Sequence, residues 1–129
     1  MPDFFDQEKV RHWLLKLILS FDKDLENINY IFCSDDYLLE INKTYLNHDY
    51  YTDIITFPYR QDDVVESDIF ISLDRVLENS TELNVSFEDE LHRVIVHGVL
   101  HLCGLKDKSD EEASRMRKAE DEALKLLNQ

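Results

Sequence analysis

Hydrophobic residues follow two different spacings along the chain, and each spacing predicts one kind of element. Near the N-terminus, apolar residues recur every three or four positions, as they do on the buried side of a helix. They predict a helix over residues 6–20 and are Val10, Trp13, Leu14, Leu17 and Ile18. Short runs rich in β-branched and aromatic residues predict strands instead. These runs cover residues 28–33, 53–57 and 68–72.

Serine and acidic residues mark the starts of several helices. A serine hydroxyl accepts hydrogen bonds from the free N–H groups of a first helical turn, and acidic side chains favour the same end. This pattern predicts helices over about residues 35–45, 86–103 and 109–127, and Gly104 ends the second of them. Residues 73–81 form another predicted helix. The chain is therefore predicted to be α+β, with about five helices and a small mixed β-sheet.

Length and composition are consistent with one domain over residues 1–129. Hydrophobic residues make up 43% of the chain, which is enough for a core at this size. No apolar run approaches the length of a membrane span, and the first residues lack the features of a secretory signal. We therefore expect a cytoplasmic protein with no membrane partner. The net charge of -14 argues against indiscriminate nucleic-acid binding, so any basic footprint must be local.

The most distinctive feature is a pair of histidines four residues apart, His97 and His101. On a helix of about 3.6 residues per turn they project from the same side. One histidine in an apolar helix is usually a core residue. Two on one face, followed by the Gly104 turn and Asp107, predict a metal site at the end of the central helix. Metalloproteases carry a glutamate beside the first histidine, whereas this chain has Gly98, so a peptidase fits poorly.

The segment from His97 onward resembles the signature of the YbeY family, the bacterial single-strand-specific endoribonucleases and rRNA maturation factors. The family signature is His-Gly-x-Leu-His-Leu-x-Gly-Tyr-Asp-His. This chain reads His97-Gly98-Val99-Leu100-His101-Leu102-Cys103-Gly104-Leu105-Lys106-Asp107. Two earlier stretches, within residues 41–58 and 67–71, are similar to further family blocks in the same order. They include Thr52-Asp53-Ile54-Ile55-Thr56-Phe57-Pro58 and Ser67-Asp68-Ile69-Phe70-Ile71.

The resemblance implies one zinc ion per chain, bound by His97, His101 and Asp107. Asp107 stands where the family has a third histidine, and a carboxylate oxygen is also a zinc ligand. Three protein ligands leave an open position for water, which the metal would activate as the nucleophile. No general base is evident. We expect Asp53 or Asp68 to orient a ligand histidine or the water, with a strand cap and a strand-edge residue as the alternatives.

Two further departures from the family concern charge near the substrate. Leu46 stands where the family has an arginine, and Lys106 stands where it has an aspartate. If the family arginine contacts phosphate, this chain either has lost that contact or supplies it from elsewhere. Lys106 and Arg60 are candidates for such a phosphate contact, and Lys43 is a further one.

The resemblance implies a zinc-dependent, single-strand-specific endoribonuclease that acts in rRNA maturation and ribosome quality control. Its expected partners are rRNA or other single-stranded RNA, and ribosomal small-subunit proteins. The acidic composition and Leu46 favour an alternative, a metal-stabilised ribosome-assembly factor that binds protein or rRNA with little or no catalysis. A metallohydrolase acting on another class of substrate is a third interpretation.

Overall fold

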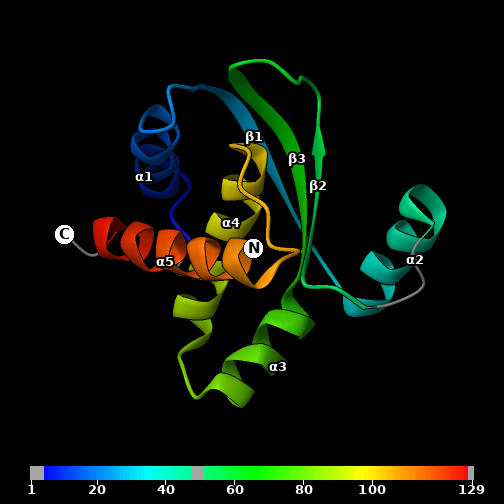
Figure 1. Cartoon of the computed structure of the whole chain (residues 1–129). Helices are drawn as coiled ribbons and strands as arrows, with labels where there is room; N and C mark the ends of the chain where they lie inside the picture. The colour runs from blue at the N-terminus through cyan, green and yellow to red at the C-terminus, as the bar shows by residue number, and fades with distance from the viewer. Residues whose placement is uncertain (1–4, 48–50, 128–129) are drawn as a thin grey trace.

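The computed structural model describes residues 5–47 and 51–127, which form five helices and three strands (Figure 1). In chain order these are α1 (Gln7–Leu19), β1 (Asp24–Cys33), α2 (Asp35–Leu46), β2 (Ile54–Pro58), β3 (Val64–Ser72), α3 (Leu73–Leu83), α4 (Phe87–Leu102) and α5 (Asp110–Leu127). The predicted α+β class is confirmed, and every predicted element is present. None of the helices in the described ranges is long and apolar enough to cross a membrane.

The three strands form a mixed sheet in the order β1-β3-β2. β1 runs parallel to β3, and β2 runs antiparallel to it. Both β1 and β3 begin four residues before the predicted starts, at Asp24 and Val64. The first half of β1 is polar and largely exposed because β1 is an edge strand, so the hydrophobic pattern there is weak. β2 continues through Pro58, which an edge strand tolerates because it needs fewer N–H donors.

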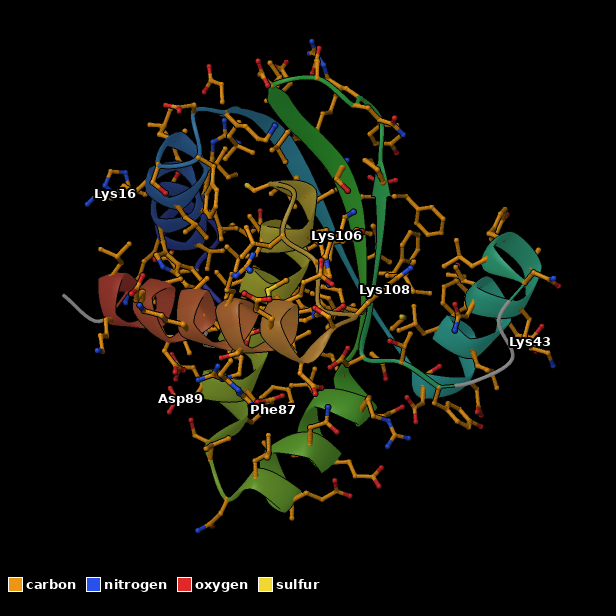
Figure 2. The ribbon with its side chains drawn as sticks, in the orientation of Figure 1. Lys16, Lys43, Phe87, Asp89, Lys106 and Lys108 are labelled. Atoms are coloured by element: carbon orange, nitrogen blue, oxygen red, sulfur yellow. The ribbon has the colours of Figure 1, made fainter. Side chains whose placement is uncertain are left out.

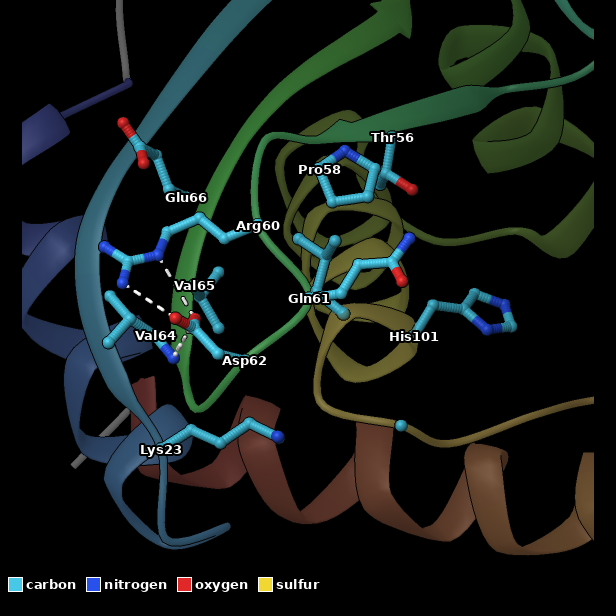
Figure 3. A pocket seen from close by; sticks show the side chains of 12 residues that line it. Lys23, Thr56, Pro58, Arg60, Gln61, Asp62, Val64, Val65, Glu66 and His101 are labelled. Carbon is cyan, nitrogen blue, oxygen red and sulfur yellow. Dashed lines mark hydrogen bonds and ion pairs between the residues drawn. The ribbon is translucent and has the colours of Figure 1, made fainter.

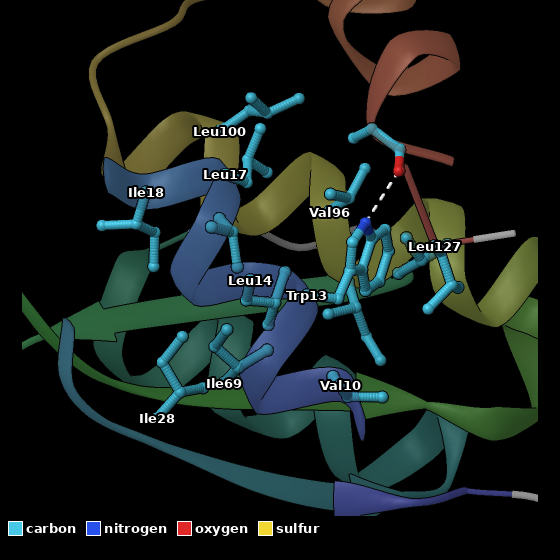
Figure 4. Packing of buried hydrophobic residues seen from close by; sticks show 14 of the residues in the cluster. Val10, Trp13, Leu14, Leu17, Ile18, Ile28, Ile69, Val96, Leu100 and Leu127 are labelled. Carbon is cyan, nitrogen blue, oxygen red and sulfur yellow. Dashed lines mark hydrogen bonds between the residues drawn. The ribbon is translucent and has the colours of Figure 1, made fainter. Parts of the chain in front are cut away.

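The larger core lies on one face of the sheet, against α1, α4 and α5 (Figure 4). Alternation along β3 turns Ile69 and Ile71 toward this core, where both are fully buried. Trp13 of α1 is buried as predicted, and its indole Nε1 donates a hydrogen bond to the carbonyl of Ala123, at 2.7 Å. This bond joins the first helix to the last, so α1 and α5 enclose α4 together with the sheet.

A smaller core lies on the opposite face, where α2 packs on the sheet. Leu38 and Ile41 of α2 are buried against Ile55 of β2. The rings of Phe57 and Phe70 meet edge to face beside them, with centroids 5.6 Å apart. In Figure 1, α2 stands at one side of the molecule, apart from the other helices.

Gly98 sets the distance between α4 and the sheet. A Cβ atom at this position would lie 2.7 Å from Cδ1 of Ile54 and 3.2 Å from Cγ2 of Thr56. Real side chains do not approach so closely, so β2 packs directly on the backbone of α4. Because Gly98 has no side chain, this strand can approach the helix closely. It places the last two turns of α4 beside the edge of the sheet.

Candidate metal centre

His97 and His101 lie on the last two turns of α4, with their Nε2 atoms facing each other at 3.1 Å. Gly104 adopts a left-handed φ of 106° just past the helix end, which turns the chain back as the glycine predicted. The turn brings Oδ2 of Asp107 to 3.4 Å from Nε2 of His97 and to 3.5 Å from Nε2 of His101. The predicted ligand set therefore converges, and its ligand atoms all lie within 4.8 Å of one another.

The spacing of these three atoms fits a single transition-metal ion. Zinc binds imidazole nitrogen and carboxylate oxygen at about 2.0–2.2 Å, so two ligands at the tetrahedral angle stand about 3.3–3.6 Å apart. The observed separations run from 3.1 to 3.5 Å. Two imidazoles and one carboxylate are also a donor set that zinc accepts. All three side chains are partly exposed, so an ion and a further ligand can reach them.

The Nδ1 atoms of both histidines are held by acceptors outside the cluster. Nδ1 of His101 lies 2.9 Å from the carbonyl oxygen of Leu105. A carbonyl only accepts hydrogen bonds, so this ring carries its proton on Nδ1 and leaves Nε2 as a lone pair. Nδ1 of His97 lies 2.7 Å from Oε2 of Glu120. Both rings therefore direct Nε2 toward Asp107, as metal ligands require.

Glu120 comes from α5 and is only 5% exposed. Its other oxygen, Oε1, accepts a hydrogen bond from Nη1 of Arg93 at 2.9 Å, and Nη2 of Arg93 bonds Asp121 at 2.7 Å. The sequence analysis did not identify Glu120. A signal for it exists, because this acidic residue interrupts the apolar face of α5 that consists of Met116, Ala123 and Leu127. An acid on the buried face of a helix needs a partner.

These contacts shift the acidity of the groups involved. The hydrogen bond to Glu120 raises the pKa of His97, although burial opposes this effect. Burial alone would raise the pKa of Glu120, but hydrogen bonds from His97 and Arg93 outweigh it and hold the pKa below its usual value. Glu120 is therefore a buried carboxylate that stays ionised between two donors.

Asp53 and Asp68, expected near a ligand histidine, lie in different places. Asp53 lines a hollow of about 340 Å³ together with His97, Asp107 and Glu120. Burial raises the pKa of Asp53. Its carboxylate accepts a long hydrogen bond of 3.5 Å from Asn79. Asp53 therefore lies beside the candidate ligands. The carboxylate that bonds Nδ1 of His97, however, is that of Glu120.

The structure corrects the placement of Asp68. Side chains alternate along β3, and the neighbours of Asp68 point into the larger core, so Asp68 points to the face that α2 covers. There its carboxylate accepts hydrogen bonds from Asn29, at 2.9 Å, and from the hydroxyl of Tyr59. With α4 on the opposite face of the sheet, Asp68 does not orient His97 or His101.

The three cations proposed for phosphate contact lie at different places relative to the cluster. Arg60 lines a second hollow, of about 330 Å³, that His101 also lines (Figure 3). Its guanidinium already bonds Asp62 at 3.1 and 2.7 Å. Lys106 is exposed in the turn between α4 and α5, directly before Asp107, whereas Lys43 lies on α2 (Figure 2). The three candidate ligands thus stand between two hollows, with Lys106 the cation next to them in the sequence.

Known proteins with similar sequences belong to the family that the sequence signature resembles. A sequence model of the family described as Endoribonuclease YbeY matches residues 3–128. The chain is 52% identical over 128 residues to a protein named Endoribonuclease YbeY from Flavobacterium psychrophilum, covering 98% of this chain and 91% of the relative. It is 49% identical over 126 residues to the protein of the same name from Bacteroides thetaiotaomicron, covering 98% and 91%. The solution structure of TM1509 from Thermotoga maritima superposes with a TM-score of 0.67 at 30% identity, covering 93% of this chain and 79% of that one.

Proposed function

The chain belongs to the YbeY endoribonuclease family, and from this premise we propose that it is a zinc-dependent endonuclease that cuts single-stranded RNA. One zinc ion is held by His97, His101 and Asp107. The observation that carries the proposal is the convergence of these three ligand atoms at separations of 3.1 to 3.5 Å. Zinc here would have three protein ligands, the number typical of catalytic zinc sites.

The chemistry divides between the metal and the protein. Bound zinc supplies a Lewis acid for the phosphoryl oxygen and lowers the pKa of a coordinated water. The protein fixes the directions of the ligands: Glu120 and the Leu105 carbonyl hold the two imidazole rings, and the turn at Gly104 presents Asp107. Partners of this kind fix the tautomer and the ring orientation of metal-binding histidines.

The two hollows beside the metal ligands suit a strand that crosses the site. One of them is lined by His101 and the other by His97 and Asp107, so nucleotides on both sides of the reacting phosphate have space. Lys106 is the main phosphate contact, since it is exposed and adjacent in sequence to a metal ligand. Arg60 contributes less, because Asp62 already neutralises much of its charge.

We place this activity in rRNA maturation and ribosome quality control in the cytoplasm, with rRNA and small-subunit ribosomal proteins as partners. The support for this role is family membership. A second function, a metal-stabilised ribosome-assembly factor that cuts little or no RNA, is favoured by the net charge of -14 and by Leu46 in the place of the family arginine. In that function the metal holds the α4–α5 turn and the acidic surface binds a basic protein.

Cleavage by purified protein separates the two functions. Zinc-loaded protein should cut single-stranded RNA, and His97→Ala or His101→Ala should abolish the cutting. His12→Ala is the matched control, because His12 is exposed on α1. Cutting at the wild-type rate in both ligand variants would identify a contaminating nuclease. The assembly-factor alternative predicts instead that cells with folded His97→Ala protein still mature their rRNA normally.

A further inference from the structure

We infer that Glu120 is a positioning residue of the metal centre, acting through His97. This inference rests on the proposed zinc site and deepens it. Oε2 of Glu120 lies 2.7 Å from Nδ1 of His97 and on the side of the ring away from the cluster. An ionised carboxylate only accepts hydrogen bonds, so it keeps the proton on Nδ1 and leaves Nε2 unprotonated, with its lone pair free to bind a metal. That tautomer is the one that a metal on Nε2 requires.

The carboxylate is built into the fold, with one hydrogen-bonding partner for each oxygen and Arg117 as a more distant cation, 3.9 Å from Oε1. Oε1 accepts from Arg93 and Oε2 bonds His97. Arg93 lies on α4 four residues before His97, so it projects from the same side of that helix. A residue only 5% exposed would not stay charged without such partners. The arrangement thus fixes the position of Glu120 independently of any metal.

If Glu120 served only to hold α5 against α4, its bond to Arg93 would be explained but its bond to His97 would not. The pairing of α4 with α5 already has an ion pair that avoids the metal ligands, because Nη2 of Arg93 bonds Asp121 at 2.7 Å. Asp121 is half exposed and stands next to Glu120 in the same helix. The second oxygen of Glu120 is directed at the candidate ligand His97 instead of at Arg93. Asp121 is therefore a natural control for the effect of breaking an acid pair with Arg93.

The two ligand histidines also differ in a way that sharpens the inference. His101 is oriented by a neutral backbone carbonyl, whereas His97 is oriented by a carboxylate. A carboxylate partner raises the basicity of a ligand imidazole more than a neutral acceptor does. We therefore expect His97 to be the stronger of the two imidazole donors, and its strength to depend on Glu120.

The test compares Glu120→Ala, Glu120→Gln and Asp121→Asn with the wild type. Zinc affinity is measured by competition with a chromophoric chelator. The tautomer of His97 is read from its ¹⁵N chemical shifts in the metal-free protein, at a pH where the rings are neutral. Glu120→Ala should weaken zinc binding by about 10-fold or more, as loss of an outer partner does, and should populate the Nε2–H tautomer of His97. Glu120→Gln retains an acceptor oxygen, so it should keep the tautomer and lose less affinity.

Asp121→Asn should leave both zinc affinity and the tautomer at wild-type values. The inference is overturned if folded Glu120→Ala protein keeps wild-type affinity and the Nδ1–H tautomer, or if Asp121→Asn weakens zinc binding equally. These readouts are independent of RNA cleavage. Wild-type protein that binds zinc yet cuts no RNA would contradict the proposed function and leave Glu120 supported. Normal RNA cleavage by the wild type, with unchanged zinc affinity in Glu120→Ala, would support the proposed function and contradict the role of Glu120.

Discussion

The two faces of the sheet are built differently, and the proposed metal ligands belong to only one of them. On the face toward α4, apolar side chains from α1, α3, α4 and α5 form one continuous core. On the other face, the buried apolar cluster found among the described residues consists of Leu38 and Ile41 of α2 and Ile55 of β2. The histidines extend from the helix that packs in the larger core. Leu46, which replaces the family arginine, ends α2 on the sparser face.

This difference indicates which features can vary without loss of the site. Ligand geometry depends on rigid packing, because displacements well under 1 Å change metal coordination. The larger core supplies that rigidity through α4. A phosphate contact from α2 is not needed to hold the ligands, so the arginine position can change while the metal site remains. Variants that perturb one face at a time test whether the two faces differ in this way.

The largest effect is expected from removing a buried leucine on each face. Leu100 and Leu38 are both fully buried, so each change to alanine should cost about 2–5 kcal/mol of unfolding free energy. Leu100→Ala should also weaken zinc binding, since Leu100 precedes the ligand His101 on α4. Leu38→Ala should leave zinc affinity unchanged. Denaturant unfolding and zinc competition measure the two effects, and equal losses of affinity in both variants would contradict the comparison.

A smaller effect is expected at the turn that presents Asp107. Gly104 has φ 106°, and within the described residues no atom lies within 4 Å of where its Cβ would stand. Gly104→Ala therefore tests backbone conformation alone, and strain should cost about 1–3 kcal/mol. Zinc affinity should fall with it, because the turn shifts Asp107. Affinity at the wild-type value with reduced stability would show that the turn does not position this ligand.

The smallest effect is expected from the cations around the site. Lys106→Ala should weaken single-stranded RNA binding and reduce the slope of log K against log salt by about 0.7, the loss of one phosphate contact. Arg60→Ala should change the slope less, because Asp62 already pairs with Arg60. Titrations at several salt concentrations measure both. A larger change for Arg60→Ala would reverse the assignment of the phosphate contact.

Sequence patterns predicted the elements well and their starts less well. All five helices carry an apolar face that is visible in the sequence, and Ser34 and Ser86 cap α2 and α4 by accepting from Tyr37 and Asp89. The missed starts of β1 and β3 have a physical cause. Residues such as Glu26 and Glu66 alternate with apolar ones where one side of the strand is exposed, so the hydrophobic run appears shorter than the hydrogen-bonded strand.

Around the metal, residues close in sequence were predictable and a distant one was not. Spacing along one helix and one turn places His97, His101 and Asp107 together. Glu120 reaches His97 only because α5 packs on α4, which no local pattern specifies. Asp68 was misplaced for a different reason. Its neighbour Ile69 faces the core, and alternation along a strand therefore directs Asp68 away from α4.

Metal content of the purified protein tests the central claim most directly. Elemental analysis should find one zinc per chain in the wild type. Asp107→Ala should retain less after dialysis, because loss of a ligand should weaken affinity by at least the roughly 10-fold that loss of an outer partner costs. Asp110→Ala, three residues further along the chain at the start of α5, is the matched control and should keep one zinc. Equal zinc in the wild type and in Asp107→Ala would contradict a site formed by two histidines and this aspartate.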